Sequence, residues 1–157
     1  MELRTLKIIG SALTWGAFTL LVLGTILNWS ESEWLAVQQT ELFRNVSGVV
    51  LFGLMLSQWG LSVGRLVYRA SGPRWERWVS VHQLVALTLP IALCVHSLAL
   101  GYGLLAVLPV LFLTALVLGL RLVGETVMKP WLPMHLVFSG LTLGATLVHI
   151  WRVVFYR

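Results

Sequence analysis

Residues Trp131 to Trp151, WLPMHLVFSGLTLGATLVHIW, form an apolar stretch long enough to cross the hydrocarbon core of a bilayer as a helix of about 20 residues. The stretch carries His135 near its start and His149 near its end, fourteen residues apart. At about 3.6 residues per turn and about 1.5 Å of rise per residue, the two imidazoles lie on one face of the helix, roughly 21 Å apart. The sequence therefore predicts a membrane-spanning helix with one histidine near each end.

Composition indicates that the whole chain is an integral membrane protein. Of its 157 residues 58% are hydrophobic and only 11% are charged, and the mean hydropathy is +0.88, far outside the range of soluble proteins. The net charge is +5, but the basic residues fall in the loops, where the positive-inside rule explains them. We therefore expect membrane lipid and no nucleic acid as a partner. The single cysteine, Cys94, excludes an intrachain disulfide and a cysteine-based zinc or iron–sulfur site.

Five apolar stretches are expected to cross the membrane as helices of one all-α domain, residues 1–157. None contains Asp, Glu, Lys or Arg, as the cost of burying charge in lipid requires. The first resembles a signal peptide, but it is too long and lacks a small-residue cleavage site, so we expect it to be retained. The expected spans are Ile8 to Leu27, Asn45 to Gly64, Val79 to Leu100, Leu104 to Leu120, and Trp131 to Trp151.

The charges between these spans orient the bundle. Most basic residues fall on the side of the N-terminus, which makes that side the cytoplasm and puts the C-terminus outside. The first outer loop, Trp29 to Phe43, suits a short interfacial helix, and a solvated connector explains its composition equally well. The cytoplasmic residues are Arg4, Lys7, Arg65, Arg69, Arg74, Arg77, Arg121 and Lys129, and the outer ones are Arg44, Arg152, Arg157, Glu31, Glu33 and Glu41.

The histidine spacing occurs a second time in the chain. His82 and His96 lie fourteen residues apart in the third expected span, each pair is preceded by a tryptophan four residues earlier, and the chain has no other histidine. The third and fifth spans are separated by one span, so they run in the same direction. His82 and His135 therefore lie at one depth, near the cytoplasmic boundary, and His96 and His149 lie at a second depth, near the outer boundary.

Two opposed imidazoles at each depth fit the axial positions of a haem iron whose other four positions are filled by the porphyrin. An interhelical hydrogen bond explains one intramembrane histidine as well, but four at matched depth and spacing favour haem. Zinc needs three or four ligands in one shell, and neither depth offers a third His, Asp, Glu or Cys. The sequence thus predicts two haems with iron ligands His82 with His135 and His96 with His149.

Small side chains on the two histidine faces leave room for a flat ring, although such residues are also typical of ordinary helix packing. Leu89 and Thr142, each seven residues beyond the first histidine of its span, are expected in the layer between the two haems. Gly140 and Gly144 lie off the histidine face and predict a close contact with a neighbouring helix. The small residues on the histidine faces include Ala86, Ala92, Ser139, Ala145 and Thr146.

Two arginines are candidates for binding the anionic propionates of the haems. Arg152 lies one turn beyond His149 on the same face, and Arg77 lies just outside His82. We therefore predict that both arginines belong to the cofactor-binding residues. Arginines that snorkel to the interface and anchor a helix would show the same pattern.

At these residues the sequence resembles the ferric-reductase-like transmembrane domain family, which includes the membrane domains of NADPH oxidases and the haem-binding subunit of the bacterial periplasmic methionine sulfoxide reductase system. The pattern W-x3-H-x13-H-x-W of Trp131 to Trp151 is most similar to the bacterial subunits, and the resemblance extends over Trp75 to Trp151. It implies two b haems between two helices that run in the same direction, in a bacterial inner membrane. Gln83 stands where members often have a basic residue, and we expect neither a sixth span nor a cytosolic flavin and NADPH domain within these residues.

The expected function is outer-sphere electron transfer, because ligation by two histidines leaves no axial position for dioxygen or a substrate. Electrons would enter from a cytoplasmic-side flavin reductase or a quinol and leave to an extracytoplasmic acceptor. The chain would then be an electron-transfer subunit of an oxidoreductase rather than a complete enzyme. Two alternatives stay open, a haem-free structural subunit of a larger membrane complex and a relative of the quinol-oxidising cytochrome b, whose Pro-Glu-Trp-Tyr motif this sequence lacks.

Overall fold

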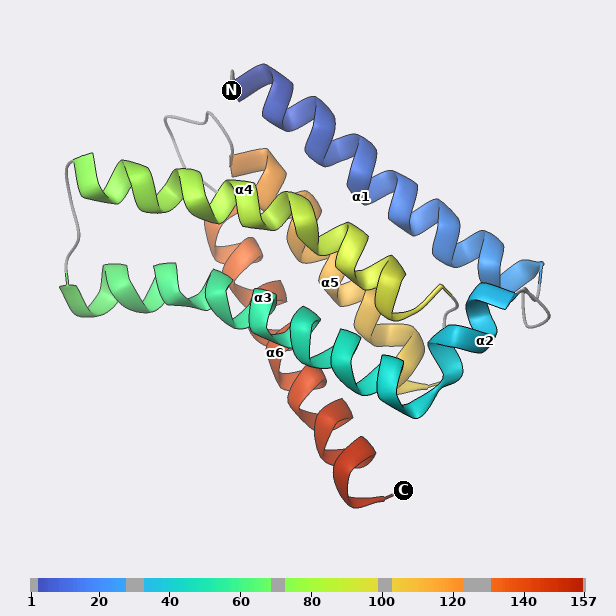
Figure 1. Cartoon of the computed structure of the whole chain (residues 1–157). Helices are drawn as coiled ribbons and strands as arrows, with labels where there is room; N and C mark the ends of the chain where they lie inside the picture. Colours follow the sequence, from blue (N-terminus) through green and yellow to red (C-terminus); the bar gives the residue numbers. More distant parts are fainter. Residues whose placement is uncertain (1–2, 28–32, 69–72, 99–102, 123–130, 157) are drawn as a thin grey trace.

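A computed structural model describes residues 3–27, 33–68, 73–98, 103–122 and 131–156, and each regular element in these ranges is an α-helix. The predicted all-α class is therefore confirmed for the described part of the chain (Figure 1). The helices are α1 (Leu3–Ile26), α2 (Glu33–Gln39), α3 (Glu41–Tyr68), α4 (Pro73–His96), α5 (Leu104–Leu122) and α6 (Trp131–Phe155).

Four helical segments among the described residues are long and apolar enough to cross a membrane, as expected of an integral membrane protein. They correspond to the first, third, fourth and fifth expected spans, although the third ends at His96 and not at the expected Leu100. The second expected span lies within α3, a helix of 28 residues that is not among the four, so five crossings remain a prediction. The four segments are Thr5–Ile26, Arg77–His96, Leu104–Leu122 and Trp131–Phe155.

Several of the charges that orient the bundle lie outside the described residues. Glu31, Arg69 and Lys129 fall in ranges that the structure does not describe, and the same holds for the side chains of Arg65 and Arg74. The direction in which the chain crosses the membrane therefore remains a prediction from the sequence.

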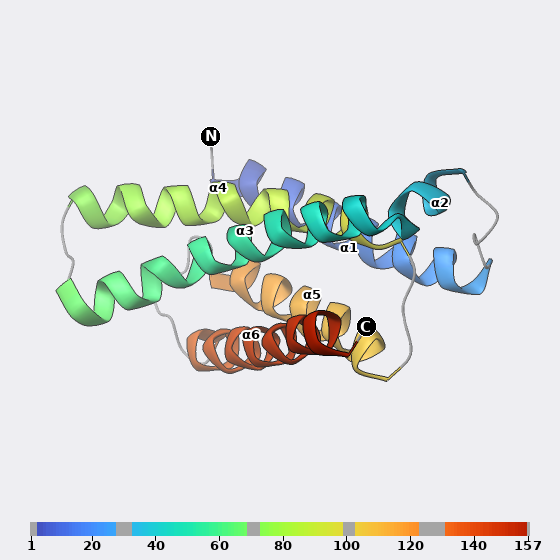
Figure 2. The same ribbon diagram turned by 60° about the horizontal axis from the view of Figure 1, so that its bottom comes forward.

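The long helices form two antiparallel pairs, α3 with α4 and α5 with α6 (Figures 1 and 2). Helix α1 packs against both α4 and α5 and so joins the two pairs. By contrast, the described backbones of α4 and α6, the helices that carry the four histidines, are not closely packed against each other. The space between these two helices is filled by side chains and cavities.

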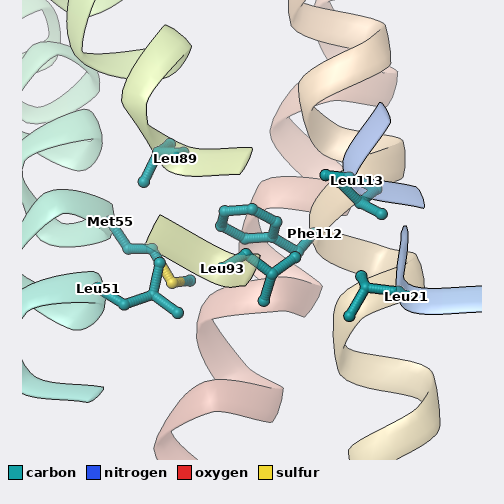
Figure 3. Close-up of a cluster of buried hydrophobic side chains, with 8 residues drawn as sticks. Leu21, Leu51, Met55, Leu89, Leu93, Phe112 and Leu113 are labelled. Atoms are coloured by element: carbon teal, nitrogen blue, oxygen red, sulfur yellow. The ribbon is translucent and has the colours of Figure 1, made fainter. Parts of the chain in front are cut away.

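A cluster of buried apolar side chains occupies the middle of the bundle (Figure 3). Leu89 and Leu93 reach into it from α4, Met55 from α3 and Phe112 from α5, and the Leu21 side chain of α1 is fully buried. These side chains are close-packed, and their fit fixes the helices relative to one another. The cluster therefore holds the two helix pairs together at mid-height.

Helix α2 shows that part of the first outer loop is helical, which was one of its two interpretations. Its Gln38 is buried and donates from Nε2 to the carbonyl oxygens of Cys94, at 2.9 Å, and Val95, at 2.8 Å. The backbone nitrogen of Leu98 donates to Oε1 of Gln38 at 3.3 Å. Because the last carbonyls of a helix have no partner within it, these bonds complete the C-terminal end of α4, where His96 lies.

The prediction that Gly140 and Gly144 make a close helix contact is wrong for the part of the chain that the structure describes. A Cβ added at Gly140 would meet only Trp59, at 3.9 Å, and a Cβ added at Gly144 would meet nothing within 4 Å. The reason is that α6 approaches its neighbour α5 through the histidine side instead, at Gly119.

Candidate cofactor site

His82 of α4 and His135 of α6 face each other across the space between the two helices. Their ring centroids are 6.5 Å apart and the ring planes cross at 83°. When two histidines bind one metal ion from opposite sides, each metal–nitrogen bond is about 2 Å long. Adding the distance from the nitrogen to the ring centroid on each side gives a centroid separation of roughly 6 Å. The pair is therefore spaced as two axial ligands of a single iron would be.

The ring of His135 is held by α5. Its Nδ1 lies 2.9 Å from the carbonyl oxygen of Ala115, and a carbonyl can only accept, so Nδ1 carries the proton and Nε2 is left with a free lone pair. Gly119, one turn further along α5, allows the close approach, because a Cβ there would lie 3.0 Å from Cε1 of His135. Histidines that bind metals usually have such a second bond, which fixes the ring and its tautomer.

The ring of His82 is held less firmly. Its Nδ1 is buried and has no hydrogen-bond partner among the described residues, although the backbone of Gln58 lies near the ring. A buried polar atom without a partner costs free energy, and a metal bond to the other ring nitrogen would not remove that cost by itself. A metal bond would, however, fix the orientation of the His82 ring, which no described hydrogen bond fixes.

The second pair lies at the other end of the same space. His96 of α4 and His149 of α6 line one cavity. Pairs at both ends require α4 and α6 to run in the same direction, as the sequence predicts.

Helix α3 holds His96 as α5 holds His135. Nδ1 of His96 lies 3.0 Å from Oγ of Ser47, and that hydroxyl has a longer contact of 3.4 Å to the carbonyl oxygen of Arg44, to which it can give its own proton. The Ser47 oxygen then accepts from Nδ1, and Nε2 of His96 is free to bind a metal. Gly48 again makes room, because a Cβ there would lie 3.2 Å from Cε1 of His96.

A cavity accompanies each pair, and the two cavities differ in size. The cavity at His82 and His135, the His82 cavity, measures about 110 Å³, and the cavity at His96 and His149, the His96 cavity, measures about 680 Å³. Cofactor pockets commonly occupy roughly 300–1,000 Å³. The His96 cavity therefore has the volume for a macrocycle as it stands, whereas the lining of the His82 cavity has to move outward to admit one.

Several of the residues expected on the histidine faces line these cavities, whereas Ala92 and Ala145 line neither. Ala86, Leu89, Ser139 and Thr142 line the His82 cavity, and Thr146 lines the His96 cavity. Leu89 and Thr142 are each only 3% exposed. A side chain that contacts both cavities, Met55, lies in the same apolar cluster as Leu89, so this cluster separates the two histidine levels.

The structure separates the candidate arginines. Arg152 is exposed and interacts electrostatically with His149 without lining the cavity, and Arg77 is exposed and lines neither cavity. Arg44, which the sequence placed only in the outer set of charges, lines the His96 cavity and interacts with His96. Spacing along α4 and α6 could not identify Arg44, because its position depends on the packing of α3 against α4.

Within the described ranges, no group of three or more His, Cys, Asp or Glu side chains could hold a metal ion. The histidines in this part of the chain occur as two pairs. Two donors per level match an iron whose remaining positions are supplied by a porphyrin, and they are too few for a metal held by the protein alone.

The resemblance to the ferric-reductase-like family is supported only by the spacing of tryptophan and histidine in the sequence. No protein-family model, curated protein or solved structure matches the chain. The function is therefore argued from the geometry of the two histidine pairs.

Proposed function

We propose that the chain is a di-haem b membrane cytochrome, related to the ferric-reductase-like transmembrane domain family, that relays electrons across the membrane. The observation that carries this proposal is the placement of two histidines from α4 opposite two from α6, with the rings of His82 and His135 6.5 Å apart at centroid. When bound, haem b would supply at each level an iron that takes up and releases one electron.

The four histidines would have two different roles in holding the haems. His135 and His96 are the pre-oriented ligands, since Ala115 and Ser47 each leave a ring nitrogen free for iron. His82 and His149 complete the two pairs from the opposite helix. Because two histidines would hold each haem, neither site would leave the iron a free position for dioxygen or a substrate, and the haems would supply electron transfer alone.

The distance between the two levels suits electron transfer through the bundle. Fourteen residues of helix separate the two histidines of α4 and those of α6, which corresponds to roughly 21 Å along the axis. The edges of two macrocycles would lie considerably closer than their irons. The buried apolar cluster that contains Leu89 and Met55 would lie in the layer between them.

In the proposed orientation five helices cross the membrane, the second of them α3. The His82 level then lies near the cytoplasm and would accept electrons from a flavin reductase or a quinol. The His96 level lies near the outer surface and would deliver them to an extracytoplasmic acceptor. The chain would be the membrane subunit of an oxidoreductase.

A pyridine haemochrome assay on the purified protein tests the proposal. We expect about two haem b per chain, one for each histidine pair. A preparation from haem-replete cells that contains no haem would overturn the proposal. Separate reduction trials with a quinol and with a flavin reductase would then identify the donor.

One observation favours a second candidate function, a haem-free structural subunit. The His82 cavity is small, and rings at 6.5 Å with planes at 83° also fit a direct edge-to-face contact between aromatic rings. In that case the histidines would pair helices inside a larger complex. The same haemochrome assay separates the two candidates, because the structural subunit contains no haem.

A further inference from the structure

The two histidine levels differ in the charge that surrounds them. Arg44 lines the His96 cavity and interacts with His96, and Arg152 interacts with His149. The described lining of the His82 cavity contains no Lys, Arg, Asp or Glu side chain. Among the described residues that line the two cavities, Arg44 alone carries a charged side chain, so the two sites differ in the charge next to the histidines.

A fixed positive charge raises the reduction potential of a nearby redox group, because the reduced form carries one more electron and is attracted more strongly. The attraction is largest where the intervening medium is apolar, and salt screens it where the charge faces water. Arg44 is an exposed residue, but the cavity that it lines is mainly apolar. Its effect on the His96 level is therefore only partly screened.

The hydrogen bonds to the histidines act in the same direction. The carbonyl of Ala115 draws the Nδ1 proton of His135 and makes this ligand a stronger electron donor, which favours the oxidised form at the His82 level. Ser47, which bonds His96, presents a hydroxyl, a weaker acceptor than a carbonyl. The hydrogen bonds and the charge therefore both raise the reduction potential of the His96 site relative to that of the His82 site.

We propose that Arg44 makes the His96 site the higher-potential site of the two and thereby sets the direction of electron transfer from the His82 pair to the His96 pair. The proposal rests on the proposed function. His82 and His135 would hold the haem that gives up one electron in this transfer, His96 and His149 would hold the haem that receives it, and no bond or proton would move. The flavin or quinol donor supplies the electron, and the extracytoplasmic acceptor removes it.

A redox titration of the purified holoprotein tests this inference. The native chain should show two midpoint potentials, and a His149→Ala variant, which removes a ligand of the His96 site, should retain the lower one. Arg44→Gln should lower the higher midpoint and leave the lower one in place, while Arg44→Lys, which keeps the charge, should restore most of the difference. Arg121→Gln is the matched control, because this exposed arginine lies over the Trp131 ring at 5.9 Å and lines neither cavity.

The possible outcomes separate this inference from the proposed function. Haem-free protein overturns both. Haem-loaded protein in which Arg44→Gln shifts neither midpoint, or both equally, overturns only the role of Arg44. If Arg44→Gln does not retain haem at the His96 site, the His149→Ala titration still decides, since a surviving midpoint equal to the higher native one contradicts the proposed order.

Discussion

At the residue scale, the four histidines fall into two kinds. His135 and His96 each have Nδ1 in a hydrogen bond to a helix that carries no histidine, whereas Nδ1 of His82 is buried without a described partner. Each pair thus contains a firmly held ring. Such a ring offers a metal one pre-oriented donor and lets the other ring adjust as the metal binds.

The Ser47→Ala variant tests the anchor of His96. Without the hydroxyl, Nδ1 loses its acceptor at 3.0 Å and the ring is free to turn, so haem at the His96 pair should bind about tenfold to a hundredfold more weakly. Haem retention during dilution and gel filtration measures the change. Ser57→Ala on the same helix is the control, because that hydroxyl bonds only to the Leu54 carbonyl of its own helix. Equal retention in both variants would contradict a role for Ser47.

The Gly119→Ala variant tests the packing of His135 against α5. The new Cβ would lie 3.0 Å from Cε1 of a ring that its bond to Ala115 prevents from retreating, so we expect loss of haem at the His82 pair alone. Gly144→Ala is the control on α6, since its Cβ would meet nothing within 4 Å and should leave loading complete. The haemochrome yield of the two variants decides, and full loading of Gly119→Ala would contradict the predicted contact.

At the scale of the elements, the helices without histidines position those that carry them. Helix α3 holds His96 through Ser47, α5 holds His135 through Ala115, and α2 completes the end of α4 through Gln38. The candidate site between α4 and α6 therefore depends on three helices that contribute no histidine to it.

The Gln38→Leu variant tests the contribution of α2. It leaves the carbonyls of Cys94 and Val95 without their side-chain partner, so the free energy of unfolding should fall by about 1–3 kcal/mol and the last turn of α4 should exchange its amide protons faster. Thermal unfolding and hydrogen exchange in detergent measure these changes. Gln39→Leu is the control, because the Gln39 side chain is exposed. Unchanged exchange at the end of α4 would contradict the capping role.

Periodicity along α4 and α6 was sufficient to predict the helices and the facing of His82 and His135, because both follow from hydropathy and a fixed helical rise. It could not predict the contacts that Ser47, Gly119 and Arg44 make, because these depend on how other helices pack against the histidine helices. The pair Gly140 and Gly144 misled for the same reason, since two small residues permit a close contact without requiring one. The role of Gln38 could not be predicted either, because the composition of its loop fitted both a helix and a solvated connector.

At the scale of the whole molecule, the bundle contains two antiparallel helix pairs joined by α1 (Figure 2). The four histidines lie on α4 and α6, one helix from each pair. One central apolar cluster separates two cavities, and among the described lining residues a charged side chain lies at only one of them. The two histidine pairs therefore differ in their electrostatic surroundings. The proposed directional relay of electrons would use this difference.

The pairing of histidines across α4 and α6 is the central claim, and the number of haems in single and double histidine variants tests it most directly. His82→Ala and His135→Ala should each remove the same haem, and combining them should remove no more, because both residues serve one site. Combining His82→Ala with His149→Ala should remove both haems, because these residues serve different sites. Retention of two haems by His82→Ala, or loss of both haems only when His82 and His135 are changed together, would contradict the account.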